Sequence, residues 1–409
     1  MIERAHPVDL APQLLAEVEA VRRLEPARAW ELLRPSFGTL SRCSSPAEQG
    51  TLWRLRGHLM RALGRAGDAV AAYRQAERRF AIAADSGERG RCAIGLVDAL
   101  MYLGRYQDAR RAAAAGRRAL AHAGDRAALA RLRMNEGNLH HRVDRPDRAL
   151  ECYRDSRRAL LATRQRAGVE LVEVNIANCL SALGRGREAR RYYRASRDRL
   201  LARGDAVNAL VASYNLSYLD FLEHRHERAL EGLAEVRRQA VARGALSIVP
   251  LTALDRAEVF LRLGAHHDAL AEARLASVEA RAMGLAYEHA KAELFAALAE
   301  HRSGRSASAH ARLERSLGAF DREGNDLWVG ETLVGLATTV WTEHGSRGAV
   351  ALLAAAARRF ELASDPERAA CALALRARAQ VVAGETRAAR TTMNAATLLA
   401  RRRNSPREQ

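Results

Sequence analysis

Hydrophobic and small residues recur along this chain with a constant spacing of 40 residues. The clearest marker is the turn phrase LGRAGDA, which returns as LGRYQDA and LGRGREA and ends on Ala69, Ala109 and Ala189. Weaker copies place an alanine at the other steps of 40 up to Ala389, without a slip. A spacing kept over so much of a chain predicts stacked copies of one structural unit rather than separate globular domains.

Within each unit, the small and large positions after the turn share one helical face. Gly57 precedes Ala69 by twelve residues, and Tyr73 and Ala76 follow that alanine by four and seven. Spacings of three and four put residues on one side of an α-helix. Small side chains there let a second helix approach, and a large one fills the gap, so each unit is predicted to contain two packed helices.

Glycines separate these helices in two further columns. One includes Gly64 of the turn phrase, and the other includes Gly124. Glycine ends helices because it adopts left-handed backbone angles at low cost. We therefore expect an all-α, right-handed superhelical solenoid of about ten antiparallel helix pairs.

The repeat suggests three segments. Residues 1–44 are expected to form a degenerate amino-terminal capping unit, and residues 45–403 the solenoid. The phrase NSPREQ at 404–409 resembles SSPAEQ and SDPERA, in which a capping residue and a proline mark a helix start. We expect 404–409 to begin a further helix that is either truncated or unpaired.

These columns resemble the tetratricopeptide repeat. The matching positions are those of Gly57, Ala69, Tyr73 and Ala76, and Trp53 falls where that repeat often has tryptophan. The unit here is longer than the usual 34 residues, and HEAT or armadillo repeats, with periods of about 40, are the second alternative. The resemblance implies a scaffold that binds a protein or peptide segment in a concave groove lined by the first helix of each pair.

A stripe at positions i, i+4, i+7 and i+11 of each first helix is expected to face this groove. Asparagines are frequent on it, and in peptide-binding members of the family asparagines of these columns hydrogen-bond a ligand's backbone. Farther along the chain the stripe contains more apolar residues, as in the helix that includes Lys291 and Phe295. Arg131 and Arg142 would suit a carboxylate. The expected partner-binding residues are Arg131, Asn135, Asn138, Arg142, Asn175, Asn178, Asn215, Tyr218, Asp255 and Glu258.

No catalytic, cofactor or metal site is expected. Lys291 is the only lysine and lies in Ala-Lys-Ala, so no phosphate-binding loop of the GxxxxGK[ST] type is present. The histidine pairs are adjacent or two residues apart, adjacent residues of a helix cannot share a metal, and there is no HExxH motif. The five cysteines form no CxxC pair and are expected to be buried, reduced thiols.

The net charge of +18 would attract acidic partners. Arginine pairs on the helices are interpreted as solvated outer faces, which leaves nucleic acid or ribonucleoprotein binding as a less favoured alternative. A second alternative follows from a weaker resemblance to bacterial proteins that couple such repeats to a caspase-like CHAT peptidase. In that case this chain would be the recognition half of a system whose peptidase it lacks. Without a signal peptide or an uncharged stretch long enough to cross a bilayer, we expect a cytoplasmic protein and no membrane partner.

Overall fold

The structure, a computed structural model, describes residues 11–22, 25–142, 145–163, 168–363 and 365–404. In these residues it contains twenty α-helices, one short 3-10 helix and no strand. The helices are α1 (Ala11–Val21), α2 (Pro26–Cys43), α3 (Pro46–Ala62), α4 (Ala66–Ile82), α5 (Ser86–Tyr102), α6 (Tyr106–His122), α7 (Arg126–Arg142), α8 (Pro146–Ala162), α9 (Val169–Ala182), α10 (Gly186–Ala202), α11 (Ala206–Leu222), α12 (His226–Ala242), η1 (Leu246–Ile248), α13 (Val249–Leu263), α14 (His266–Ala282), α15 (Ala286–Arg302), α16 (Ser306–Glu323), α17 (Asp326–His344), α18 (Ser346–Leu362), α19 (Pro366–Val382) and α20 (Thr386–Asn404).

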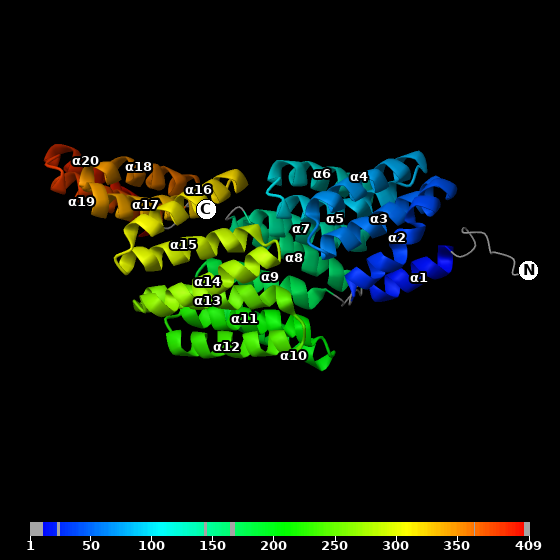
Figure 1. The fold of residues 1–409 in the computed structure, drawn as a ribbon. Helices are drawn as coiled ribbons and strands as arrows, with labels where there is room; N and C mark the ends of the chain where they lie inside the picture. The colour runs from blue at the N-terminus through cyan, green and yellow to red at the C-terminus, as the bar shows by residue number, and fades with distance from the viewer. Residues whose placement is uncertain (1–10, 23–24, 143–144, 164–167, 364, 405–409) are drawn as a thin grey trace, which may run out of the picture. The chain divides into compact units, whose positions relative to one another are not determined.

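The repeat length follows directly from the helix lengths. Helices α3 to α6 have 17 residues each, and three residues join each helix to the next. Two helices and two connections therefore make one 40-residue unit (Figure 1). The odd-numbered helix comes first in each pair and the even-numbered helix second.

Local signals in the sequence determine where the helices begin and end. Ser45 caps α3 in a capping box with Glu48, whose side chain returns to the Ser45 backbone. Gly64 and Gly124 have φ angles of 73° and 69°, as predicted for the two glycine columns. Ala84 occupies the second column with a φ of 56°, although alanine is disfavoured there.

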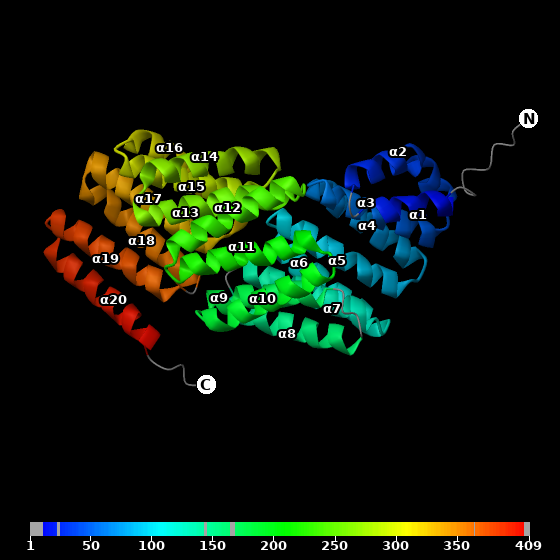
Figure 2. The same ribbon diagram turned by 90° about the horizontal axis from the view of Figure 1, so that it is seen from below.

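The chain divides into two compact units, Met1–Cys179 and Leu180–Gln409, with the boundary inside α9. Each unit is a stack of antiparallel helix pairs with its own apolar core. In the second unit, for example, α17, α18, α19 and α20 lie side by side in chain order (Figure 2). The all-α solenoid of helix pairs predicted from the sequence is confirmed.

The predicted packing columns form the interior of each pair. Ala69, Tyr73 and Ala76 are fully buried. A methyl group added to Gly57 would lie 2.7 Å from Cε1 of Tyr73, so only glycine allows this ring to pass between the helices. The small and large columns therefore pack as the sequence predicts.

Within each stack, the first and second helices form two different layers. Neighbouring first helices contact each other, as in α3 with α5, α5 with α7, α11 with α13, α13 with α15 and α15 with α17. No comparable contact joins two second helices within the described parts of either unit. The first helices thus form the closer-packed inner face of each stack, and the second helices form a more open outer face.

Two sequence predictions concern individual residues: the further helix at 404–409 and the buried cysteines. Residues 405–409 lie outside the described part of the chain, and α20 runs to Asn404, so the further helix at 404–409 remains a prediction. The cysteine prediction was wrong for Cys371, which is exposed, whereas Cys92, Cys152 and Cys179 are buried thiols.

Candidate functional site

In the first unit, tyrosines of the second helices extend through the helix pair toward the inner face. The Tyr153 hydroxyl donates a 2.7 Å hydrogen bond to Oδ1 of Asn138 on α7. The Tyr73 hydroxyl lies 2.8 Å from Nδ1 of His58 on α3. Each partner lies 15 residues before its tyrosine. The helix-packing columns and the inner face are therefore linked by hydrogen bonds.

The predicted asparagine ladder is only partly available to a ligand. Asn135 is 6% exposed, and its amide nitrogen donates a 2.7 Å hydrogen bond to the carbonyl oxygen of Ile94 on α5. This corrects the expectation that Asn135 is an exposed groove residue, because its donor holds two first helices together. Asn175 donates to Oδ1 of Asn138 at 3.3 Å, so both hydrogen bonds to Asn138 end on its oxygen.

The other three predicted residues of the first unit are placed on its first helices. Arg131 is exposed, and Arg142 and Asn178 are half-buried. All three already interact with other groups of the structure.

Near the start of this unit, charged groups also meet on the inner face. Arg61 forms a 3.0 Å ion pair with Asp98, whose pKa is raised by burial. His58, beside Tyr73, has its pKa lowered to about 3, first by burial and then by the positive charges of Arg22, Arg54 and Arg61. The imidazole of His58 is therefore neutral at physiological pH.

In the second unit, the inner face carries a cluster built around the only lysine of the chain. Nζ of Lys291 on α15 lies 3.3 Å from Oε2 of Glu258 on α13. The Tyr218 hydroxyl on α11 reaches the same carboxylate oxygen at 3.5 Å. The Tyr214 hydroxyl donates to Asp255. These five residues, Tyr214, Tyr218, Asp255, Glu258 and Lys291, are called the lysine cluster below.

Burial and charge set the protonation states in the lysine cluster. Lys291 is 8% exposed and Asp255 3%. The pKa of Lys291 is raised despite burial because Glu258, Tyr218 and Asp255 surround the ammonium group. The pKa of Asp255 is raised to about 7, mainly by burial and against the attraction of Lys291. At neutral pH the cluster thus holds a protonated lysine beside a carboxyl group whose pKa lies well above that of an exposed aspartate.

Aromatic rings complete the surroundings of the ammonium group. Nζ lies 4.7 Å from the ring centroid of Trp328 and 5.1 Å from that of Phe295. Such cation–π contacts stabilise a desolvated ammonium group. Farther along the same face, Arg368 on α19 forms a 2.7 Å ion pair with Glu331 on α17, whose pKa is raised by burial.

Sequence reasoning placed Tyr218, Asp255 and Glu258 in the site, and the structure brings these three together. It does not bring in Asn215, which is half-buried on α11 and has no hydrogen bond to the cluster within the described residues. Tyr214, Lys291 and Trp328 were missed. A usable signal was present, because Lys291 lies on the predicted stripe and is the only lysine among 66 basic residues.

One group of side chains in the second unit has the residue types of a catalytic triad. Ser277, His289 and Glu293 lie together, with the serine oxygen 3.0 Å from Nδ1 of His289 and 2.9 Å from Oε1 of Glu293. The carboxylate contacts the serine rather than the imidazole, so the groups are not in the serine–histidine–acid order of a nucleophilic triad. Arg312 and Arg315 hold the same carboxylate, which favours a structural role.

Within the described part of the chain, no group of three or more histidine, cysteine, aspartate or glutamate side chains is placed to hold a metal ion. None of the described helices combines the length and apolar character that crossing a membrane requires.

The sequence matches no protein-family model and no curated protein. The structure is similar to several solved structures at low sequence identity. A STAND ATPase with a tetratricopeptide repeat sensor from Pyrococcus horikoshii matches 86% of this chain, with 13% identity and a TM-score of 0.53, and the match spans about half (52%) of that protein. A Rap protein complexed with competence and sporulation factor matches 97% of this chain and 99% of its own, with 12% identity and a TM-score of 0.52.

A third similar structure is the apo form of the quorum sensor NprR from B. thuringiensis. It matches 83% of this chain and 97% of its own, with 12% identity and a TM-score of 0.56. None of these three is described as carrying a caspase-like domain or as binding nucleic acid, so those alternatives gain no support. At these identities the similarity concerns the fold, and the chain has the tetratricopeptide-repeat fold that its 40-residue columns predict.

Proposed function

We propose that this chain is a scaffold that binds an extended segment of a peptide or protein on the inner faces of its helix stacks, and that binding regulates an effector. The observation that carries this proposal is the lysine cluster. Helix packing in this fold uses the alanine and tyrosine columns, which point between the helices. The cluster is separate from them and gathers side chains from three successive first helices, α11, α13 and α15.

The chemistry of the cluster suits a polypeptide backbone. Glu258 has 20% of its side chain exposed and offers a carboxylate acceptor, the ammonium group of Lys291 has two N–H bonds beyond the one directed at Glu258, and the tyrosine oxygens can accept. An extended backbone presents both N–H and C=O groups, and ring faces beside it can cover apolar side chains. Desolvation of charged groups costs folding free energy, and groups with shifted pKa values are concentrated at functional sites.

The structural neighbours support this class of function. The Rap protein is described in complex with a factor, and NprR is described as a quorum sensor. Each has this fold over nearly its whole length. A regulatory scaffold that responds to a bound partner is therefore the role proposed here, with the partner's identity left to experiment.

The test begins with selection of ligands from a phage-displayed library of random peptides. Selected peptides are synthesised, and their dissociation constants are measured by calorimetry for the wild type and for the double variant Glu258→Gln/Tyr218→Phe. We expect about tenfold weaker binding to this variant, as for loss of a central interface group. The matched control is Glu314→Gln/Tyr192→Phe, which makes the same chemical changes on second helices and should bind as the wild type does.

Because Lys291 is the only lysine, biosynthetic labelling with lysine carrying ¹³C at Cε places a single probe in the cluster. Its NMR signal is expected to move when a selected peptide binds, since the rings of Phe295 and Trp328 surround it. If no peptide is selected, or if selected peptides bind the inner-face variant normally and leave the signal unmoved, the proposal is wrong.

A further inference from the structure

Pockets open on the outer side of the stacks, between consecutive second helices. One lies between α4 and α6 over α5, a second between α6 and α8 over α7, and a third between α16 and α18 over α17. Their volumes are about 560, 210 and 780 Å³. They arise because second helices do not contact each other as the first helices do. The three grooves have the same arrangement of helices, so the charges of the residues that line them can be compared directly.

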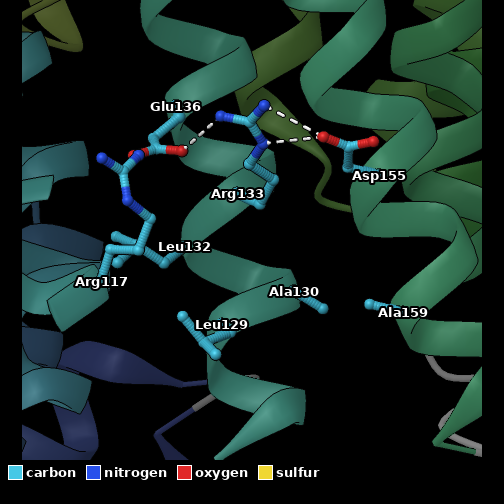
Figure 3. Close-up of a pocket in the computed structure, with 8 residues that line it drawn as sticks. All are labelled: Arg117, Leu129, Ala130, Leu132, Arg133, Glu136, Asp155 and Ala159. Atoms are coloured by element: carbon cyan, nitrogen blue, oxygen red, sulfur yellow. Dashed lines mark hydrogen bonds and ion pairs between the residues drawn. The ribbon is translucent and has the colours of Figure 1, made fainter. Parts of the chain in front are cut away.

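The α6–α8 pocket is electrically balanced. Arg117 forms a 2.7 Å ion pair with Glu136, Glu136 a 2.9 Å pair with Arg133, and Arg133 a 3.0 Å pair with Asp155. Figure 3 shows the four charged side chains in one continuous chain above an apolar wall. Every charge in this pocket is neutralised by the protein itself.

The α16–α18 pocket is balanced as well. Its charged lining residues are Glu314, Asp321, Arg358 and Arg359. Arg359 is held by Asp321 at 2.7 Å and by Asp326 at 2.8 Å. Two carboxylates therefore accompany two guanidinium groups.

The groove between α4 and α6 differs from both. Its lining contains four arginines, Arg74, Arg78, Arg89 and Arg111, but only two carboxylates, Glu77 and Asp108. Asp108 is already bound by Arg105 as well as by Arg111. No ion pair among the described residues holds Arg74, Arg78 or Arg89, and all three are exposed. The pKa of Glu77 is raised by burial, against the attraction of Arg89 and Arg74.

The floor of the α4–α6 groove is apolar. Leu96 and Leu100 of α5 lie beneath it, and Gly116 of α6 lies beside them. A methyl group on Gly116 would come within 2.3 Å of Cβ of Ala93, so α6 packs closely on α5 there and leaves the leucines as the base of the groove. A ligand that fills this groove needs apolar groups for the floor and negative groups for the rim.

We infer that the α4–α6 groove is a docking site for an acidic amphipathic segment of a partner protein. Its carboxylates would pair with Arg74, Arg78 and Arg89, and its apolar side chains would lie against Ala81, Ala112 and Ala115, above the buried Leu96 and Leu100. Arginine binds carboxylates through paired hydrogen bonds, and each such contact is stronger where water is excluded. A nucleic acid fits less well, because the lining has no aromatic side chain on which a base could stack. This site lies on the outer side of the first unit and does not depend on the inner-face function proposed above.

The experiment uses the full chain and a synthetic helical peptide of leucine and glutamate, added in fluorescence anisotropy titrations. The test variant is Arg74→Gln/Arg78→Gln/Arg89→Gln. The matched control, Arg148→Gln/Arg154→Gln/Arg158→Gln, removes the same charge from three exposed arginines of α8. We expect binding to the test variant to be about tenfold weaker or more, binding to the control to be unchanged, and wild-type affinity to fall as salt rises.

Two further probes decide the chemistry of the occupant. The same peptide with glutamine in place of glutamate should bind at least tenfold more weakly, since its carboxylates are gone. An oligothymidylate should bind more weakly than the acidic peptide. The inference is overturned if the acidic peptide does not bind, if the control variant weakens binding as much as the test variant, or if the oligonucleotide binds more tightly through the same arginines. Circular dichroism melting curves check that both variants remain folded.

Discussion

The Tyr153 hydroxyl donates to Oδ1 of Asn138 across the helix pair α7–α8, and Gly137 lies under the same ring. A large side chain of the second helix thus packs against glycine and at the same time holds a polar residue of the inner face. The stability of the helix pair and the geometry of the inner face are therefore coupled at neighbouring positions of the sequence.

Replacing Gly137 with alanine should destabilise the protein. The added methyl group would lie 2.6 Å from Cε1 of Tyr153, whose ring is 2% exposed and cannot easily move away. Overpacking of this kind costs about 1–3 kcal/mol, which a lower midpoint in urea denaturation would report. The control is Gly67→Ala in α4, where nothing lies within 4 Å of the added methyl, so the midpoint should stay equal or rise. Equal effects of the two substitutions would show that the close ring contact does not exist.

Asn135 and Asn215 occupy the same column of the repeat but should respond differently to substitution. Asn135→Ala removes the 2.7 Å hydrogen bond from a buried amide to the carbonyl oxygen of Ile94, which costs about 0.5–1.5 kcal/mol. Asn215→Ala removes a half-buried amide and should change stability by about 0.5 kcal/mol or less. Thermal melting of both variants measures the difference. A harmless Asn135→Ala would return Asn135 to the list of ligand-binding candidates.

The sequence predicts the fold far better than the site, and these two asparagines show why. A packing column repeats at every unit, so one misread position is outweighed by its copies, and Ala69, Tyr73 and Gly57 are placed correctly. The partner of Asn135 is a backbone oxygen 41 residues earlier on another first helix. That contact depends on how closely two first helices approach, which no spacing within one helix reports.

The lysine cluster shows the same limit of prediction from sequence, here for residues that the sequence did not indicate. The stripe contains Tyr218, Asp255 and Glu258 because each lies at a fixed step along its own helix. Tyr214 lies off the stripe of α11, and Trp328 lies on α17, outside the helices that carry the predicted residues. Both reach the cluster because long side chains extend beyond the register of their own helix, so their contribution is visible only once neighbouring helices are in place.

Replacing Ala84 with glycine should stabilise the protein. Its φ of 56° lies in the left-handed region at a position where other units have glycine, such as Gly124. Relief of this strain, less the extra backbone entropy of glycine, should stabilise the protein by about 1 kcal/mol or less. The reverse change, Gly124→Ala, meets no atom within 4 Å and should lower stability through strain alone. Urea denaturation of the two variants should therefore shift in opposite directions, and shifts of the same sign would contradict the backbone assignment.

The carboxyl group of Asp255 should make stability fall as pH rises through the neutral range. Its pKa in the folded protein is about 7, raised first by burial, whereas an aspartate in an unfolded chain titrates near pH 3.9. Between these values the folded state binds more protons than the unfolded state, so the free energy of unfolding decreases with pH and levels off above pH 7. Lys291 opposes this effect, and Glu258 and the Tyr214 hydroxyl face the same group.

Asp255→Asn removes this titration while keeping an oxygen that can accept from Tyr214. The melting temperature of the variant relative to the wild type should therefore be higher at pH 8 than at pH 5. Asp268→Asn, at an exposed aspartate of α14, is the control and should shift the melting temperature equally at both pH values. If the Asp255→Asn difference is also independent of pH, Asp255 is ionised throughout this range in the folded protein. Asp255, Glu258 and Lys291 would then form a triad with two negative charges and one positive charge. The inner face of the second unit would therefore present more negative charge to a ligand.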